Sequence, residues 1–301
     1  MKTEYHAGTV RSHRIGLAAI FLVWITAAIS VPLIKILNVR LSAEEILIWR
    51  SLACIAVALA IVRGKVWRST KETKQAGFLI GFSSIAFYRA IEVWDVNPVV
   101  VLGCFIPVVN VGIDIYGRKK TSSTIILSLC CILAGTAWAL EPWNQRLNPE
   151  GLMWSAAFVI LGGIGFDMWG KAPETDTVLE KSFWLSLWTG VYAVLILVVA
   201  RPFSGIAVYG DGRIAGILAI YLVLSAVFIF VSIIPFNRIG KMPTATASIL
   251  LQAATPATIV GAFLLLGERL SLSQWLGVAL ALVGAGFLSV QSIQSEPSST
   301  G

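Results

Sequence analysis

Apolar runs separated by short polar segments recur along the whole chain. Ten of these runs are long enough to cross the roughly 30 Å hydrocarbon core of a bilayer as helices. They lie at 15–37, 44–62, 76–94, 97–116, 122–140, 151–170, 180–200, 214–236, 243–266 and 272–290. We therefore predict an all-α membrane protein with about ten transmembrane helices.

The two ends of the chain are polar. Residues 1–14 are polar and basic, and the apolar run after them is longer than the core of a signal peptide. We predict a cytoplasmic N-terminal tail over 1–14, followed by a retained helix. Residues 291–301 are polar and Ser-rich, so we expect a disordered cytoplasmic tail.

The two halves of the sequence resemble each other. Residues 76–140 begin with AGFLIG, and residues 215–290 begin with AGILAI. In each half a proline starts the next span and a second one lies within it: Pro98 and Pro107, Pro243 and Pro256. Because a repeat of five spans is odd, the second copy must be inverted relative to the first. Inverted repeats are characteristic of secondary transporters.

The repeats are predicted at 15–146 and 147–290. The last helix of each carries small residues at four-residue spacing, a pattern that lets helix backbones approach closely in lipid. These seam residues are Cys131, Gly135 and Ala139 in the first copy, and Gly277, Ala281 and Ala285 in the second.

Several motifs resemble those of a known family. GERLS at 267–271, QWLG at 274–277 and GAG at 284–286 resemble the end of an EamA domain, found in the drug/metabolite transporter superfamily. LIWRSLA at 47–53 resembles that family's second-helix motif. The resemblance covers essentially the whole chain as two copies, and it implies a small-molecule carrier without naming its substrate. The first copy departs from the pattern, with Gly117-Arg118 where the family has Gly-Glu.

The composition requires a bilayer as solvent. Charged residues make up 13% of the chain and hydrophobic residues 57%, whereas soluble domains are about 25% charged. The net charge of +7 would suggest nucleic acid in a soluble protein. Here most of the basic residues lie in loops or at the ends of spans, so we expect a lipid bilayer and a small-molecule substrate as partners, and no nucleic acid. A homodimer is left open.

Successive loops lie on alternate sides of the membrane, and basic residues are distributed unevenly between the two resulting sets of loops. The side with more Lys and Arg is expected to be the cytoplasmic one. The set that includes both chain ends carries Lys2, Arg11, Arg14, Arg63, Lys65, Arg68, Lys71, Lys74, Arg118, Lys119, Lys120, Lys171, Lys181, Arg238 and Lys241. The other set carries Lys35, Arg40, Arg146, Arg201, Arg213 and Arg269. We predict both termini in the cytoplasm, and short outer loops suggest a bacterial inner membrane.

Motifs for metal binding and catalysis are missing from the sequence. The four cysteines lie in apolar runs without a CxxC pair, and His6 and His13 lie far from them. No Walker-type GxxxxGK[ST], HExxH or GxSxG occurs, and no span contains histidine. We expect no metal, no cofactor and no enzymatic activity.

Arg50 lies about six residues inside the second span. An ionisable side chain at such depth costs about 2.5–3.5 kcal/mol on insertion scales and needs a reason. Arg50 either faces a central cavity and attracts an anionic substrate, or snorkels outward or pairs with Glu45.

Arg89 is a second candidate for contact with substrate. Glu92 and Asp95 follow it at three-residue steps, which places the three charges on one helix face. Either this face lines a transport cavity, or Glu92 and Asp95 merely neutralise Arg89. The neighbouring Tyr88 is a candidate hydrogen-bond partner of substrate, or a packing residue.

Pro107 and Pro256 occupy corresponding positions in spans 4 and 9. Each removes a backbone donor, and paired helix breaks in two repeats indicate a central site. Asn110 and Gln252 lie close to these breaks and are candidate substrate ligands. Trp24, in the middle of the first span, either stacks on a substrate ring or packs in the core.

Asp114 and Asp167 lie near the predicted cytoplasmic ends of spans 4 and 6. Intramembrane carboxylates often carry protons in coupled transport. The alternative is an interfacial position, with Asp167 paired to Lys171. Glu268 is expected to accept backbone N–H bonds at the start of span 10.

These features predict a secondary active transporter that works by alternating access, with a site near the midplane formed by spans 1, 3, 4, 6, 8 and 9. The expected substrate is a small polar metabolite such as an amino acid or related compound, and the family resemblance favours export. A membrane-embedded enzyme would need convergent acid–base groups, and only scattered carboxylates occur. A non-transporting tether or sensor is the other alternative.

Overall fold

The computed structural model of the chain describes residues 2–62, 65–116, 123–141, 147–173, 175–200, 212–234 and 254–294. Every regular element within these ranges is a helix. The helices are α1 (Lys2–Leu37), α2 (Ala43–Val62), the short 3-10 helix η1 (Lys65–Arg68), α3 (Lys71–Val93), α4 (Val96–Gly103), α5 (Ile106–Tyr116), α6 (Ser123–Leu140), α7 (Pro149–Lys171), α8 (Val178–Ala200), α9 (Gly212–Ile233), α11 (Ala254–Leu266) and α12 (Leu272–Gln294).

The long helices have the length and composition of membrane spans. Six are long and apolar enough to cross a bilayer: Ala18–Leu37 within α1, α2, α3, α7, Val178–Val199 within α8, and α9. Four shorter apolar helical stretches are Val96–Asn110, Ile126–Leu140, Ala254–Leu266 and Leu272–Gly284. The described part of the chain is thus the all-α structure of a multi-pass membrane protein.

Most predicted spans agree with the observed helices to within a few residues. The first one differs, because α1 begins at Lys2 rather than near residue 15. Residues 2–14 contain no proline, so nothing in this segment blocks the helical hydrogen bonds and the polar residues extend the helix. At the other end α12 continues to Gln294, and residues 295–301 lie outside the described part.

The fourth predicted span is two helices. α4 ends at Gly103 and α5 begins at Ile106. Between them the amides of Cys104 and Phe105 bond carbonyls only three residues back. Pro107 is the second residue of α5, where its missing N–H removes no helical bond. The interruption of this span therefore lies just before Pro107, between Gly103 and Ile106.

Pro256 has a related position but a less complete description. It is the third residue of α11, which begins at Ala254. Residues 235–253 lie outside the described part, so the predicted break before Pro256 is not tested.

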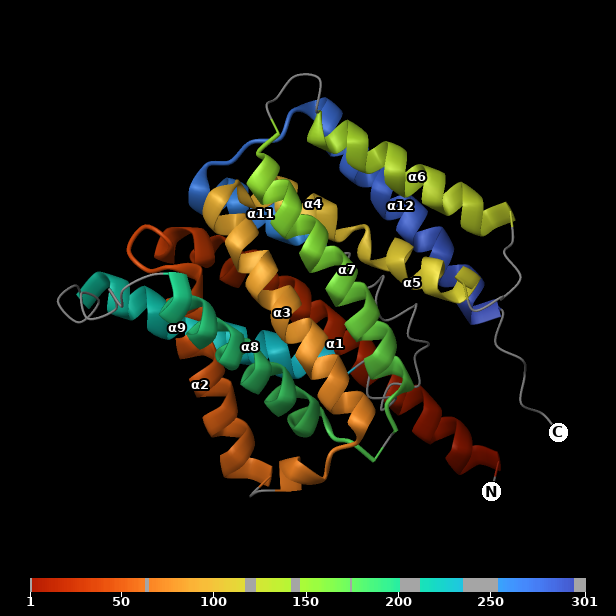
Figure 1. Cartoon of the computed structure of the whole chain (residues 1–301). Helices are drawn as coiled ribbons and strands as arrows, with labels where there is room; N and C mark the ends of the chain where they lie inside the picture. Colours follow the sequence, from red (N-terminus) through yellow and green to blue (C-terminus); the bar gives the residue numbers. More distant parts are fainter. Residues whose placement is uncertain are drawn as a thin grey trace.

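The helices pack as neighbours from opposite halves of the sequence (Figure 1). α3 packs against α7 and α8, and α1 packs against α9 and α11. α2 lies against α8, and both α4 and α5 contact α7. The core therefore lies between the two halves rather than within either one.

α6 and α12 pack against each other through the predicted small-residue seams. They lie side by side at one edge of the molecule, at the upper right in Figure 1. A Cβ added at Gly135 would lie 2.6 Å from the carbonyl oxygen of Gly277, and one added at Gly284 would lie 2.7 Å from that of Ser128. The expected close approach of helix backbones is confirmed.

Glu268 holds the start of α4. Its carboxylate accepts the backbone N–H groups of Val96 and Asn97, each at 3.1 Å, and these amides have no partner within their own helix. The prediction that Glu268 accepts backbone bonds is confirmed, but the expected helix was wrong, because the loop after α11 lies against α4. The start of α12 is closed instead by Ser271 and Gln274, which exchange side chain–backbone bonds.

Glu268 is expected to make stability depend on pH. Burial raises the pKa of its carboxyl above the usual 4.5, although the N–H groups of Val96 and Asn97 lower it. An acid whose pKa is raised in the folded state binds more protons folded than unfolded. Its contribution to stability is therefore largest at low pH and falls as pH rises through the raised pKa.

The Tm of the detergent-solubilised protein is measured from about pH 4 to about pH 8. We expect Glu268→Gln to remove the part of the pH dependence of Tm that Glu268 causes. Glu268→Ala, which lacks any acceptor, is the comparison and should lower Tm at every pH. An unchanged pH slope in the glutamine variant would assign the dependence to other groups.

Candidate functional site

The helices form a cavity of about 200 Å³. Its walls come from α1, α3, α4, α5, α7, α9 and α11, with Arg50 of α2 and Leu185 of α8. All six spans predicted to form the site contribute, since α4 and α5 together make up span 4. This cavity is the candidate functional site.

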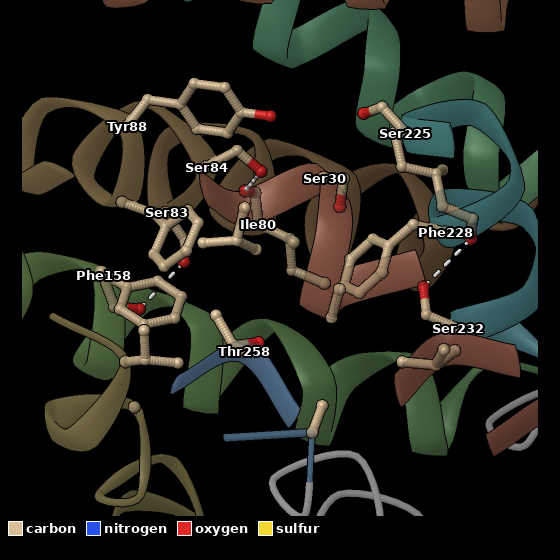
Figure 2. Close-up of a pocket in the computed structure, with 18 of the residues that line it drawn as sticks. Ser30, Ile80, Ser83, Ser84, Tyr88, Phe158, Ser225, Phe228, Ser232 and Thr258 are labelled. Carbon is tan, nitrogen blue, oxygen red and sulfur yellow. Dashed lines mark hydrogen bonds between the residues drawn. The ribbon is translucent and has the colours of Figure 1, made fainter. Parts of the chain in front are cut away.

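The cavity walls are mainly apolar and aromatic. Six aromatic side chains line it: Phe87, Tyr88, Phe158, Phe166, Trp169 and Phe228. Hydroxyl groups are interspersed among them, from Ser30, Ser83, Ser84, Ser225, Ser232, Thr255 and Thr258. Figure 2 shows these groups arriving from several helices around one space. The site therefore offers an apolar surface with scattered hydrogen-bonding groups.

Arg50 is the only charged side chain that lines this cavity among the described residues. It is 6% exposed, and its Nη1 donates to the hydroxyl of Tyr88 at 3.0 Å. That hydroxyl also bonds the hydroxyl of Tyr221, which accepts a bond from Ser225 at 3.3 Å. The chain of bonds joins α2 and α3 in the first half to α9 in the second.

The guanidinium of Arg50 has unused donors. Its Nε and Nη2 are buried and have no hydrogen-bond partner within the described part of the chain. The alternative that Glu45 pairs with Arg50 is not observed. Glu45 instead closes a capping box with Ser42 at the start of α2. A buried cation without an acid partner is costly, so this site favours an incoming anion.

Several hydroxyl groups of the cavity already donate hydrogen bonds to backbone carbonyls. Ser83 donates to the carbonyl of Phe158 at 2.8 Å, Ser84 to that of Ile80 at 3.0 Å, and Ser232 to that of Ile229 at 3.1 Å. Two of these bonds run within one helix, a common arrangement for serine in apolar helices. These oxygens remain free to accept a hydrogen bond from a ligand.

The structure brings two of the six predicted substrate-binding residues to the cavity, Arg50 and Tyr88. Trp24 lies in α1, half-buried beside Phe21, and does not line it. Asn110 also lies away from it, with both amide atoms buried and unpartnered among the described residues. Gln252 lies outside the described part.

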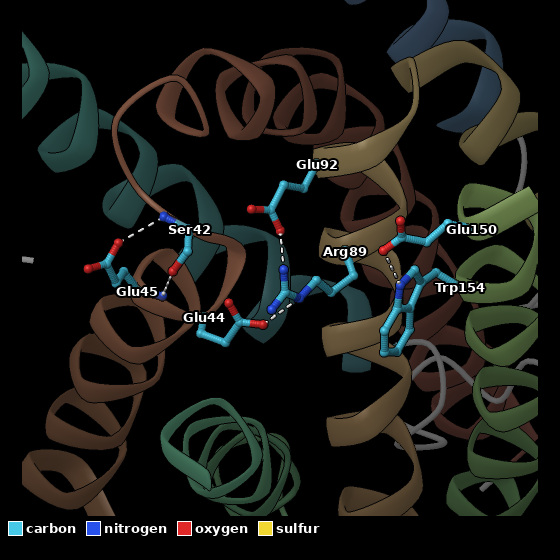
Figure 3. Close-up of polar contacts among 7 residues, drawn as sticks. All are labelled: Ser42, Glu44, Glu45, Arg89, Glu92, Glu150 and Trp154. Carbon is cyan, nitrogen blue, oxygen red and sulfur yellow. Dashed lines mark hydrogen bonds and ion pairs between the residues drawn. The ribbon is translucent and has the colours of Figure 1, made fainter. Parts of the chain in front are cut away.

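Arg89 lies in an ion-pair cluster instead of the cavity wall. Its Nε is 2.5 Å from Glu44 of α2, and its Nη1 is 2.7 Å from Glu92. The Glu44 side chain is 1% exposed. Figure 3 shows Arg89 reaching between the two carboxylates. The alternative that acids merely neutralise Arg89 therefore describes this site, with Glu44 as a partner that the sequence did not indicate.

The two candidate proton carriers are described unequally. Asp167 pairs with Lys171 at 2.5 Å and does not line the cavity, which agrees with the interfacial alternative. The side chain of Asp114, in α5, lies outside the described part. No group of three or more His, Cys, Asp or Glu side chains that could hold a metal ion occurs in the part of the chain that is described.

Sequence reasoning missed Tyr221 and most of the cavity hydroxyls. Tyr221 and Ser225 lie four residues apart, and Ser232 lies seven further on. This spacing places all three on one side of α9. A polar stripe on an otherwise apolar span is a signal that could have identified this face.

Comparison with known proteins bears on the fold alone. No protein-family model and no curated protein sequence matches this chain. Solved structures do match, and one of them, described as the crystal structure of a protein, is similar with a TM-score of 0.63 at 17% sequence identity. The match covers 96% of this chain and 99% of the other. The chain is therefore similar in fold to an experimentally determined protein over almost its full length.

Proposed function

We propose that the chain is a secondary active transporter of the EamA type, in the drug/metabolite transporter superfamily, that exports a small metabolite by alternating access. The observation that carries this proposal is the cavity between the two halves, with buried Arg50 in its wall. Ionisable side chains inside membranes mark substrate or ion pathways. A tether or sensor needs no such cavity.

The packing of the helices supports an arrangement as two inverted five-helix repeats. If the two halves are exchanged, α1, α2, α3 and α6 correspond to α7, α8, α9 and α12. The pair of helices α4 and α5 corresponds to α11. Under this exchange the contacts α2–α8 and α6–α12 are unchanged. The contact between α3 and α7 corresponds to the contact between α9 and α1. The contact between α1 and α11 corresponds to the contacts of α7 with α4 and α5. All these pairs are packed together. Such an exchange is expected of a transporter whose repeats rock about a shared site.

The proposed location is a cell inner membrane with both termini in the cytoplasm. The support for this orientation is the excess of Lys and Arg in the loops on the side of the chain ends. Export then requires the cavity to open toward the cytoplasm first and to the outside afterwards.

Uptake into proteoliposomes tests the carrier. Labelled amino acids, nucleosides and organic acids are compared with and without an imposed pH gradient. We expect gradient-dependent uptake of one class, and a loss of at least about tenfold in Arg50→Gln, because a charge-assisted contact with substrate is removed.

The matched control is Arg40→Gln, which removes an exposed arginine in the loop between α1 and α2 and should transport normally. Folding of each variant is checked by its elution as a single species. If folded protein moves no compound of any class, the carrier proposal fails and the tether becomes the better explanation.

A further inference from the structure

We infer that the cavity takes a small organic monoanion with an apolar body, whose carboxylate pairs with Nε and Nη2 of Arg50, an inference that rests on the proposed carrier function. This class differs from the amino acids expected from the sequence, which are zwitterions. It excludes cations and disfavours zwitterions. Three observations support this inference: the Nε and Nη2 of Arg50 that are unpartnered in the described part of the chain, the charge of the cavity walls, and the apolar surface of these walls.

The free donors of Arg50 have the arrangement that a carboxylate requires. Nη1 is engaged by Tyr88, whereas Nε and Nη2 have no partner among the described residues. These two nitrogens can donate two parallel bonds to the two oxygens of one carboxylate. The bond to Tyr88 and the Tyr88 ring, whose centroid is 5.1 Å from the guanidinium carbon, help to hold this edge in place.

The described part of the walls provides no counter-charge for an ammonium group. None of the described residues that line the cavity is Asp or Glu. Residues 235–253, which join α9 to α11 outside the described part, contain Arg238 and Lys241 but no acid. A ligand with one negative charge neutralises Arg50, whereas the ammonium of a zwitterion enters without an ionic partner. Burial of an unpaired charge is strongly unfavourable.

The rest of the cavity suits an apolar body of modest size. Phe87 and Phe158 pack with ring centroids 4.8 Å apart, and Phe166, Trp169 and Phe228 extend the aromatic surface. The volume of about 200 Å³ is below the roughly 300–1,000 Å³ of pockets for drug-sized ligands. A phenyl ring or branched alkyl group on a short carboxylic acid matches this size and surface.

A series of three compounds with the same phenyl body tests the charge requirement on the unaltered protein. 3-Phenylpropanoate carries only the carboxylate, phenylalanine adds an ammonium, and phenethylamine carries only the ammonium. Binding to the purified protein in detergent is measured by calorimetry. We expect 3-phenylpropanoate to bind, phenylalanine to bind at least about tenfold more weakly, and phenethylamine to show no binding. Equal or tighter binding of either amine-containing compound overturns the inference.

Variants of Arg50 then test the assigned contact. Arg50→Gln should abolish binding of 3-phenylpropanoate. Arg50→Lys should weaken it, because lysine keeps the charge but lacks the two parallel N–H donors of a guanidinium. Arg40→Gln is the control that should bind normally. Unchanged binding by folded Arg50→Gln would overturn the assigned contact. If that variant does not fold, the series of three compounds still decides the substrate class.

The two proposals fail separately. Gradient-dependent transport of amino acids or amines that 3-phenylpropanoate does not inhibit would leave the carrier intact and overturn this substrate class. Binding of 3-phenylpropanoate to a protein that transports no compound would leave the site intact and overturn the carrier.

Discussion

Gly135→Ala is expected to force α6 and α12 apart and to lower the thermal stability of the protein. The added Cβ would lie 2.6 Å from the carbonyl oxygen of Gly277, and it would also contact the backbone of Ala281. Backbone atoms cannot rotate away as the end of a flexible side chain can. Overpacking typically costs about 1–3 kcal/mol. It therefore exceeds the gain of about 1 kcal/mol in helix propensity on replacing glycine with alanine.

The measurement is Tm in detergent, with Gly216→Ala as the matched control. Gly216 lies in α9 and has no atom within 4 Å of an added Cβ, so only the favourable change in propensity remains there. Gly135→Val should lower Tm further than Gly135→Ala. A Tm for Gly135→Ala equal to that of the control would show that the helices tolerate a wider separation.

Arg89→Ala is expected to destabilise the protein by about 3–5 kcal/mol, as is typical when one partner of a buried ion pair is removed. The substitution leaves Glu44, with a side chain 1% exposed, without its partner at 2.5 Å. It also removes the ion pair between Glu92 and the same guanidinium. The result should be visible as a large fall in Tm or in the yield of folded protein.

Lys171→Ala is the matched comparison, because it breaks the pair with Asp167 in which the lysine is 65% exposed. Such surface pairs contribute about 0–1 kcal/mol. Adding Glu44→Gln to Arg89→Ala should restore part of the lost stability by removing the unpaired charge. If that double variant folds but no longer binds substrate, Arg89 has a role at the site that its ion pairs do not explain.

The helices could be predicted closely because the bilayer constrains them. Most predicted spans fall within a few residues of an observed helix, since apolar length sets where a span begins and ends. The spans that form the cavity could also be predicted, from the paired prolines and the repeat. The extent of α1 and the division of span 4 into α4 and α5 depend on local hydrogen bonding, which hydropathy does not report.

The contents of the site could be predicted only in part. Tyr88 and Arg89 are adjacent, but consecutive residues of a helix point about 100° apart. One therefore lines the cavity while the other pairs with Glu44. Spacing along the chain placed Arg89 and Glu92 on one face of α3, but did not show which neighbour that face meets. The expectation that Asp95 continues this face was wrong, because α3 ends at Val93 and Asp95 precedes α4. Glu44 and Tyr221 come from other helices, so only the packing identifies them.

The pairing of α6 with α12 has a consequence for biosynthesis. α6 ends at Leu140 and α12 begins at Leu272, so almost half of the chain is synthesised between the two. During that interval the nascent protein holds α6 in the membrane without the surface that fits Gly135. The contact between α6 and α12 can therefore form only after α12 has been synthesised. A chain that ends before Leu272 leaves the surface of α6 around Gly135 without its packing partner.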